Sequence, residues 1–468
     1  ANVVAGEAGG ITQHISAYEV NWKGTQLTFL DTPGHAAFTS MRERGASIAD
    51  VAILIVSAED GAKAQTKEAY ETVEKAGIPI IVAINKIDLP GANIEMTKQT
   101  LSEIGVYVEG YGGTVPYVGI SAKTGAHIEE LMDLIVLQSE IMDLDYNKNM
   151  PATGVVLESF VDSKRGNSAT LIIKNGVLEN GQYVQVGPAL APTRIMENFL
   201  GQQVKQVFPG QAVKVVGFDE IPSAGSTFAT LLKKSEAQEA QNEAKLEAQE
   251  IKNLDDSHEE FQFLSEDIFV LPVIIKADVL GTLEAIEQEV KNIQIENVKI
   301  KLIRRGVGPI NVSDIQLAKS DKNTCVIAFH TSIDKQAREL SEIHGIEIFE
   351  FDIIYKLVEW LEEFTHNAKP KKEIEEIVGT LKVIRVFNRS KDSQVVGGKV
   401  MSGSMKNKHT IQVVRKDLVI GKGRIVELQQ FKQPVAEVKE GNECGLSIES
   451  KYDIAEGDLL QMIVKKVI

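Results

Sequence analysis

The feature that most constrains the fold is an alternation of apolar runs with amphipathic helical patterns between residues 20 and 140. The apolar runs are QLTFLD (26–31), DVAILIVSA (50–58), IPIIVAIN (78–85) and VPYVGIS (115–121). The helical patterns are QTKEAYETVEKAG (65–77), MTKQTLSEIG (96–105) and the closing GAHIEELMDLIVLQSEIMDL (125–144). Strands that are apolar almost throughout are buried on both faces, and helices between them provide parallel crossovers. This segment therefore predicts a parallel sheet covered on both faces.

The remaining chain predicts further domains. Residues 150–232 hold short β-type runs separated by turn signals, which indicate a small β-barrel. Residues 233–256 are polar almost all round and predict a solvated connecting helix. Residues 268–350 return to strand–helix alternation, the pattern of a smaller α/β domain. An amphipathic helix at 352–368 is expected to bridge to a final β-rich barrel.

We expect six segments of multidomain α/β and β class. They are an N-terminally incomplete α/β domain (1–148), a β-barrel (149–232), a helical linker (233–262), an α/β/α domain (263–351), a connecting helix (352–372) and a C-terminal β-barrel (373–468).

Composition excludes several classes of protein. The two cysteines, Cys325 and Cys444, rule out a disulfide scaffold and a four-cysteine zinc site, and they fit a reducing compartment. We find no apolar run near the ~18 residues that span a bilayer and no signal-peptide pattern. The net charge is −16, yet residues 379–468 hold 16 Lys and Arg against 10 Asp and Glu. This basic end indicates a polyanion-facing module, with a chance surface asymmetry as the alternative.

The sequence DTPGH follows the first apolar run. Asp31 is suited to hold a magnesium ion through water, and Gly34 to offer its backbone N–H to a terminal phosphate. His35 is a candidate to orient an attacking water, and the alternative is a helix N-cap or turn residue. Upstream, Thr12 lies in the glycine-rich GEAGGITQHI (6–15), where its hydroxyl is placed to close onto the magnesium when a third phosphate is present. The alternative for Thr12 is a plain loop threonine.

Two later loops carry a base-recognition pattern. In NKID, Asp88 can accept hydrogen bonds from N1 and N2 of guanine, Asn85 can hold the base edge, and the Lys86 stem can lie across the ring. In SAK, a backbone N–H of residues 121–123 can meet the guanine oxygen while Ser121 braces the loop. Each motif alone also fits a strand-end turn. Their order, each after a predicted strand, predicts a guanine-nucleotide site at the carboxyl edge of the sheet.

The phosphate cradle of such a site is absent from the sequence. A loop GxxxxGK[ST] wraps backbone N–H groups around the β-phosphate, and no match occurs in the 468 residues. We expect the cradle and the first strand to lie upstream.

Long segments extend these motifs to a family. GEAGGITQHISAYEV, FLDTPGHAAFTSMRERGASIAD and IPIIVAINKIDLPGAN resemble the guanine-nucleotide domain of bacterial-type translation initiation factor 2. NGVLENGQYVQVG, KADVLGTLEAI with RRGVGPINVSDI, and EVKEGNECGLSIE with AEGDLLQ resemble its second, third and last domains. The resemblance implies a P-loop GTPase-type domain, GTP or GDP with Mg²⁺, and a ribosome-dependent GTPase of the cytoplasm, or of an organellar matrix. It implies as partners both ribosomal subunits, formylmethionyl initiator tRNA and other initiation factors, with no membrane. The implied roles are placing the tRNA on the small subunit and promoting large-subunit joining.

The same resemblance implies site residues. The implied nucleotide and metal residues are Thr12, Asp31, Thr32, Pro33, Gly34, His35, Asn85, Lys86, Asp88, Ser121, Ala122 and Lys123. For the formylmethionyl end of the tRNA the resemblance implies Phe431, Glu443, Cys444 and Gly445. A buried small hydrophobe is the alternative for Cys444.

The chain departs from the family pattern at three places. Gln429 and Gln430 replace a basic pair, Lys399 replaces a cysteine, and Ala64 replaces a proline. The first two predict weaker formylmethionine recognition.

Two other functions compete. One is a different translational GTPase, an elongation or special-tRNA factor, although the α/β run at 268–350 argues against it. The other is a fragment that binds tRNA and the ribosome without hydrolysing GTP.

Overall fold

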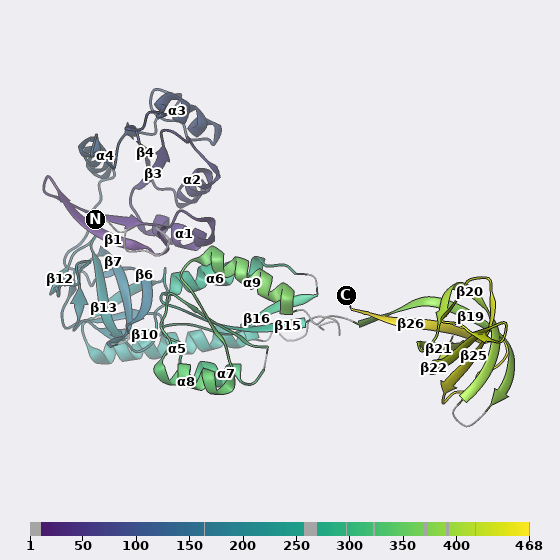
Figure 1. Ribbon diagram of the computed structural model, residues 1–468. Helices are drawn as coiled ribbons and strands as arrows, with labels where there is room; N and C mark the ends of the chain where they lie inside the picture. The colour runs from purple at the N-terminus through teal and green to yellow at the C-terminus, as the bar shows by residue number, and fades with distance from the viewer. Residues whose placement is uncertain are drawn as a thin grey trace. The chain divides into compact units, whose positions relative to one another are not determined.

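The computed structural model describes residues 11–162, 164–256, 269–295, 297–321, 323–368, 373–389, 393–416 and 418–467. The chain divides into two compact units at the break between residues 368 and 369 (Figure 1). No helix of the described ranges is long and apolar enough to cross a membrane.

The first domain contains the expected parallel sheet, in the order β3-β4-β5. The strands are β3 (Ala52–Ser57), β4 (Ile80–Asn85) and β5 (Tyr117–Gly119), and the helices are α1 (Thr39–Ile48), α2 (Ala64–Ala76), α3 (Ile94–Glu103) and α4 (Ile128–Ile141). Alternate residues of β4 face opposite sides: Val82 and Ile84 pack in a core with Leu101 of α3, and Ile81 and Ala83 pack in a core with α4. Burial on both sides explains why these strands are apolar throughout.

The strand expected at 26–31 departs from that prediction. It is β2 (Thr25–Asp31), which pairs antiparallel with β1 (Ser16–Trp22) and not with the parallel strands. Lys23 and Gly24 form the two-residue turn, and both have positive φ, 48° and 94°. Such turns match the twist of paired strands, so the local sequence favours a hairpin.

The second domain is the expected β-barrel. Its main sheet has the order β10-β9-β14-β6-β7-β13-β11, with a separate pair β12-β8, and β10 also contacts β13. The strands are β6 (Thr153–Asp162), β7 (Gly166–Asn175), β8 (Leu178–Glu179), β9 (Tyr183–Val186), β10 (Ala189–Pro192), β11 (Met196–Glu197), β12 (Gln206–Val207), β13 (Ala212–Phe218) and β14 (Thr227–Leu231).

Helix α5 (Lys234–Asp256) has the expected extent, but it is not solvated all round. Ala237 is fully buried, and Gln241 donates from Nε2 to the carbonyl of Pro188 and to Asp219 Oδ2. The first half of the helix therefore packs on the barrel (Figure 1), because a few small and amide side chains dock it without an apolar stripe. The rest of the predicted linker, 257–262, lies outside the described residues.

The third domain is a three-layer α/β/α sandwich. Its parallel sheet has the order β16-β15-β17-β18, with α6 and α9 packed on one face and α7 and α8 on the other. The elements are β15 (Phe269–Ala277), α6 (Leu280–Asn292), β16 (Val298–Val307), α7 (Val312–Ala318), β17 (Cys325–Phe329), α8 (Lys335–His344), β18 (Ile348–Phe351) and α9 (Ile354–Ala368). Helix α7 was not expected. Its signal is a capping box in which Asn311 accepts from the Asp314 backbone and Asp314 accepts from the Asn311 backbone.

The second unit is an antiparallel barrel. Strand β19 pairs with both β26 and β20, which closes β19, β26, β21, β22, β25 and β20 into a ring. The strands are β19 (Glu373–Arg389), β20 (Ser393–Lys406), β21 (Thr410–Arg415), β22 (Leu418–Gln430), β23 (Gln433–Pro434), β24 (Glu437–Lys439), β25 (Glu443–Ser450) and β26 (Leu459–Val467).

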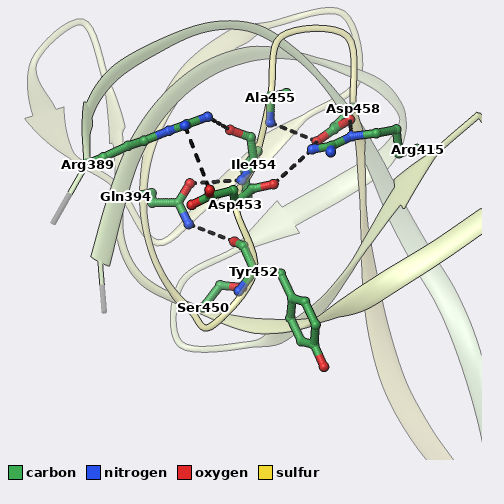
Figure 2. A network of polar contacts seen from close by, with 9 residues as sticks. All are labelled: Arg389, Gln394, Arg415, Ser450, Tyr452, Asp453, Ile454, Ala455 and Asp458. Carbon is green, nitrogen blue, oxygen red and sulfur yellow. Dashed lines mark hydrogen bonds and ion pairs between the residues drawn. The ribbon is translucent and has the colours of Figure 1, made fainter. Parts of the chain in front are cut away.

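A polar network fastens the loop between β25 and β26 (Figure 2). The buried Gln394 donates to the carbonyl of Tyr452 at 2.7 Å and accepts from the backbone N–H of Ile454 at 2.9 Å. Arg415 forks onto both oxygens of Asp458, at 2.8 and 2.7 Å. The loop is therefore held by side chains from the neighbouring strands.

Candidate nucleotide site

The end of β4 and the loop after β5 are joined by one amide. Asn85 Oδ1 accepts from its neighbour Lys86 N at 2.8 Å and from Ala122 N at 3.0 Å. The structure thus brings the NKID and SAK loops together, as the positions of their strands predicted.

A second contact links the same loops. The fully buried Ser121 donates from Oγ to Asp88 Oδ1 at 2.7 Å and accepts from Thr124 N at 3.2 Å. The hydrogen bond from Ser121 is the main cause that lowers the pKa of the exposed Asp88 carboxyl. Asp88 is therefore an ionised acceptor near neutral pH, suited to two N–H groups of a guanine edge.

Lys86 adopts a left-handed backbone, with φ of 69°. Its side chain is half exposed, and Nζ lies 3.8 Å from Asp60 Oδ2. A non-glycine residue in this conformation is uncommon, and such residues cluster at binding sites. Lys123 is exposed beside Ala122.

The residues predicted to contact the phosphates begin where β2 ends. Asp31 is the last residue of β2, opposite Ser16, and the chain then continues through the half-buried Thr32 and the buried Pro33. Gly34 is exposed, and a Cβ placed on it would meet no protein atom within 4 Å. Packing therefore does not require a glycine at this position, and its contact with a phosphate stays a prediction.

His35 occupies the position that its alternative interpretation described. Nδ1 accepts from Ala37 N at 3.1 Å and caps the short 3₁₀ helix Ala36–Phe38. The exposed ring also lies beside Tyr355 of α9, at 6.3 Å between centroids. Because Nδ1 is an acceptor, the proton of the neutral ring is on Nε2. This nitrogen can orient a water by donating to it but cannot accept its proton.

Arg42 is a site residue that the sequence analysis missed. Its side chain is 7% exposed, and Nη1 donates to the carbonyls of His35 at 2.5 Å and Pro33 at 3.2 Å. Nη2 donates to Thr39 Oγ1 at 3.0 Å and pairs with Glu68 of α2. The guanidinium therefore holds the DTPGH loop on α1 and α2. The only sequence signal is its place in the first turns of the helix that follows the motif.

The segment that carries Thr12 lies on the third domain. Gln13 is fully buried, donates to the carbonyl of Asp352 at 2.8 Å and accepts from Ile354 N at 3.3 Å. His14 Nε2 lies 2.9 Å from Asp278 Oδ2. Thr12 itself is half-buried, and its predicted role at magnesium stays a prediction.

In the second unit, the predicted tRNA-end residues fall into two groups. Cys444 is 6% exposed in the barrel core, and burial raises the pKa of its thiol to about 11. Glu443 and Gly445 alternate with it on the outer face, where Glu443 is opposite Lys399 and Gly445 is opposite Gly397. The side chain of Cys444 thus has the environment of a small core hydrophobe.

Two aromatic rings are exposed on this unit. Phe431 is 92% exposed in a left-handed turn after β22, two residues beyond Gln429, which pairs with Gly445. Phe387 is 64% exposed, and its ring lies 2.8 Å from where a Cβ on Gly397 would be. Phe387 therefore lies beside the strand position that pairs with Gly445, and nothing in the motif spacing marks it.

The fold and the joined NKID and SAK loops define a guanine-nucleotide-binding protein of the translation-factor class. Four family models match the chain. They are "Elongation factor Tu GTP binding domain" at residues 2–140, "Elongation factor G domain 2" at 151–231, "Translation-initiation factor 2" at 243–362 and "Elongation factor Tu domain 4" at 379–461.

Two bacterial proteins that match the whole chain are named translation initiation factor IF-2. The chain is 39% identical over 476 residues to translation initiation factor IF-2 of Bacillus pumilus, covering 100% of this chain and 67% of that protein. It is 40% identical over 473 residues to translation initiation factor IF-2 of Bacillus subtilis, covering 100% of this chain and 66% of that protein. A crystal structure of GDP-bound aIF5B from Aeropyrum pernix is similar at 26% identity, over 98% of this chain and 87% of that one, with a TM-score of 0.44. The chain belongs to the translation initiation factor 2 family, and it spans about two thirds of the length of these Bacillus relatives.

Proposed function

We propose that the whole protein is a ribosome-dependent GTPase of translation initiation. In this proposal it binds formylmethionyl initiator tRNA, places it on the small ribosomal subunit and promotes joining of the large subunit as GTP is hydrolysed. We expect it in the cytoplasm, or in an organellar matrix, where such ribosomes work. The observation that carries the proposal is the pair of contacts Asn85–Ala122 and Ser121–Asp88, which join the NKID and SAK loops as binding of a guanine edge would require.

The division of roles follows from the atoms at the site. Asp88 accepts from N1 and N2 of guanine, a backbone N–H of the loop at 121–123 donates to the base oxygen, and the Lys86 stem covers the ring. Adenine presents the wrong donors and would leave the Asp88 carboxylate without partners. At the phosphate end, Gly34 N–H donates to the terminal phosphate, and His35 orients the attacking water through Nε2–H.

Magnesium fits the residues proposed for it. Asp31 and Thr12 offer a carboxylate and a hydroxyl, which are the oxygen ligands that this ion prefers. When bound, the ion offsets the negative charge of the phosphates.

Exchange of one atom at Asp88 tests the nucleotide assignment. Asp88→Asn should lower the affinity of the whole protein for guanosine nucleotides about 10- to 100-fold, because a charge-assisted hydrogen bond pair is lost. The same change should raise affinity for xanthosine nucleotides, because an amide N–H donates to the oxygen that replaces the guanine amino group. Titration calorimetry with both nucleotides measures this.

The matched control is Asp133→Asn. Asp133 is an exposed carboxylate on α4 of the same domain, and it pairs with Lys23 of the turn between β1 and β2. It should leave both affinities unchanged. Equal guanosine affinity for Asp88→Asn and the parent would contradict the assignment.

The last barrel is proposed to bind the acceptor end of the tRNA. Gly445 and Glu443 lie on its outer face near Phe387, and its sequence carries a net charge of +6 over 379–468. The charge supplies a salt-sensitive attraction to phosphates, while a pocket that excludes a charged α-amino group supplies selectivity for the formyl group.

Titration of residues 373–468 tests this part of the proposal, because they form most of a separate compact unit with its own core. Formylated tRNA should bind more tightly than unformylated tRNA by about 1–3 kcal/mol, toward the lower end since Gln429 and Gln430 replace basic residues. The preference should persist when salt is raised. Equal binding of both tRNAs at two salt concentrations would mean that the barrel attracts tRNA by charge alone and has no pocket for the formyl group.

A function at another step of translation is less well supported. The α/β/α third domain, matched by the "Translation-initiation factor 2" model at 243–362, stands where elongation factors usually continue with barrels. A fragment that binds but does not hydrolyse would show as tRNA and ribosome binding without turnover.

A further inference from the structure

A cluster of two histidines and one aspartate joins the segment before β1 to the third domain, and one of its members, His14, lies in the glycine-rich segment that also carries Thr12. His14 Nε2 is 2.9 Å and His330 Nδ1 is 3.8 Å from the same oxygen, Asp278 Oδ2. One ligand atom from each residue lies within 4.8 Å of the other two. The three side chains are 24%, 14% and 27% exposed for His14, His330 and Asp278, so they are sheltered but reachable from solvent.

We propose that His14, Asp278 and His330 form a binding site for a divalent transition-metal ion, with Zn²⁺ as the ion of choice. Tetrahedral coordination at about 2.0–2.2 Å places ligand atoms about 3.3–3.6 Å apart, between the 2.9 and 3.8 Å observed here. Two imidazoles on one such ion have ring centroids about 5 Å apart. The rings of His14 and His330 are separated by 5.5 Å. Small side-chain rotations therefore bring all three atoms to coordination distance.

The fold holds two of the ligands in place. Asp278 follows β15 and His330 follows β17, and these neighbouring parallel strands pair Ala277 with Phe329. Their carboxyl ends lie at one edge of the sheet, where functional residues of α/β folds gather. The third ligand, His14, comes from the segment before β1.

Further contacts hold two of the ligands, Asp278 and His330, in position. Asp278 Oδ1 accepts from Val279 N at 2.8 Å, which leaves Oδ2 directed at the two rings. His330 donates from its backbone N to the carbonyl of Phe351 at 3.0 Å, and its ring packs on Phe329 at 4.8 Å between centroids. Such supporting contacts keep metal ligands in position before the ion binds.

The chemistry of the three ligands favours zinc over magnesium. Two imidazoles and a carboxylate are the donors of open zinc sites, in which a water completes the coordination. Magnesium disfavours imidazole ligands, so the ion of the nucleotide would not compete for this cluster.

The proposed site has a consequence that rests on the proposed function. One residue, Gln13, separates His14 from Thr12, so an ion on His14 keeps the Cα atom of Thr12 within about 7 Å of that of His14. Gln13 fastens the same segment to the same domain through Asp352 and Ile354. A bound metal would therefore hold the Thr12 segment on the third domain and restrict its closure onto a nucleotide.

Metal binding by the full chain tests the site without nucleotide. The probe is Zn²⁺ in titration calorimetry, with Co²⁺ as a spectroscopic substitute, in a buffer with excess Mg²⁺. We expect one Zn²⁺ per chain and a visible absorption band of four-coordinate Co²⁺. His330→Ala and Asp278→Asn should each weaken Zn²⁺ binding at least 10-fold and remove the band. Zn²⁺ should also slow hydrogen exchange at the backbone amides of residues 11–15 in the parent chain.

The controls separate a metal site from an ordinary hydrogen bond. His14→Gln can still donate to Asp278, so it should preserve folding and yet lose the metal. His344→Ala removes an exposed histidine of α8 in the same domain and should change nothing. Zn²⁺ binding that is absent, that survives in His14→Gln, or that falls equally in His344→Ala overturns the site. If Zn²⁺ binds as expected but Asp88→Asn leaves guanosine affinity unchanged, the metal site is still supported. Only its proposed effect on nucleotide binding is then contradicted.

Discussion

Single side chains of the nucleotide domain act by joining loops that come from different strand ends. Asn85 and Ser121 tie the NKID and SAK loops together, and Arg42 ties the DTPGH loop to two helices. In each case a polar group that is mostly or fully buried finds its partners on another segment. Loss of one partner leaves a group unsatisfied, which costs about 1–3 kcal/mol.

His35→Ala should slow ribosome-stimulated GTP hydrolysis roughly 100-fold or more while sparing nucleotide affinity. The ring donates to the attacking water in our proposal, so its loss affects turnover and not binding. Single-turnover hydrolysis and a nucleotide titration of the whole protein measure the two quantities. His127→Ala, at an exposed histidine before α4, is the control and should match the parent. A parent-like rate in His35→Ala would remove the residue from the mechanism.

Arg42→Lys should lower both the melting temperature and the hydrolysis rate. Lysine keeps the charge but lacks the fork that reaches the carbonyls of Pro33 and His35 together. The expected loss of unfolding free energy is about 1–3 kcal/mol, measured by denaturant titration. Lys67→Ala breaks only an exposed pair with Glu71 and should cost about 0–1 kcal/mol. Equal effects of the two variants would contradict a bracing role for Arg42.

At the scale of elements, close approach between strands decides where glycine is required. A Cβ on Gly421 of β22 would lie 2.0 Å from Cδ2 of Tyr452, whose backbone Figure 2 shows held by Gln394. A Cβ on Gly445 would meet no atom within 4 Å. The two glycines sit on neighbouring strands, yet only the first is demanded by packing.

Gly421→Ala should therefore destabilise the C-terminal barrel by about 1–3 kcal/mol, the usual cost of overpacking. Gly445→Ala should leave the unfolding free energy of the barrel, measured by thermal melting, within about 0.5 kcal/mol of the parent value. The double change Gly421→Ala with Tyr452→Ala should lose less than the two single changes added together, because the clash is relieved. Additive losses would show that Tyr452 is not the obstacle.

The loop between β25 and β26 should make this barrel sensitive to acid. Burial raises the pKa of Asp458, but hydrogen bonds from Arg415 and Ala455 N outweigh it and hold the pKa below the ordinary 3.8. A carboxyl with a depressed folded pKa adds stability above its unfolded pKa and loses it as pH falls through the folded value. Unfolding free energy should thus drop as pH falls below about 4, and Asp458→Asn should flatten that drop. A parallel pH profile for the variant would exclude Asp458 as the cause.

At the scale of the first unit, three domains meet at one buried arginine. Arg44 of α1 is 6% exposed and lies 3.9 Å from Glu158 of the barrel, and it pairs with Glu284 of α6. Glu158 Oε1 also accepts from Gly281 N at 3.1 Å, and a Cβ on Gly281 would lie 2.7 Å from Glu158 and Met41. Burial is the main cause that raises the pKa of Glu158. The junction thus contains a carboxyl that is costly to keep charged.

Charge removal at this junction should have opposite effects on its two sides. Arg44→Ala removes the cation partner of the buried Glu158. This change should destabilise the first unit by about 3–5 kcal/mol. Glu158→Gln keeps an acceptor for Ser159 N and Gly281 N and should be neutral or stabilising at neutral pH. Calorimetric melting of the full chain measures both, and a double variant should recover part of the Arg44→Ala loss. Strong destabilisation by Glu158→Gln would mean that the ion pair itself stabilises the junction.

Local sequence determined the elements that bury continuous or alternating apolar runs. Apolar patterning predicted the parallel strands at 52–57 and 80–85 and the barrel strand at 153–162. The helix at 234–256 was predicted instead from its polar, helix-forming composition. The proximity of the NKID and SAK loops was also predictable, because they follow neighbouring strands of the parallel sheet. These features depend on interactions within a segment or between neighbouring segments, so the chain sequence specifies them directly.

Only the tertiary structure decided which distant groups meet. It docked α5 on the barrel through Gln241, and it turned Cys444 into the core while Gly445 faces outward. It also assembled Arg42 with the DTPGH loop and His14 with Asp278 and His330, which are separated by up to 316 residues in the chain. No local pattern encodes such contacts, because their energy comes from burial and partnering of single side chains that periodicity does not register.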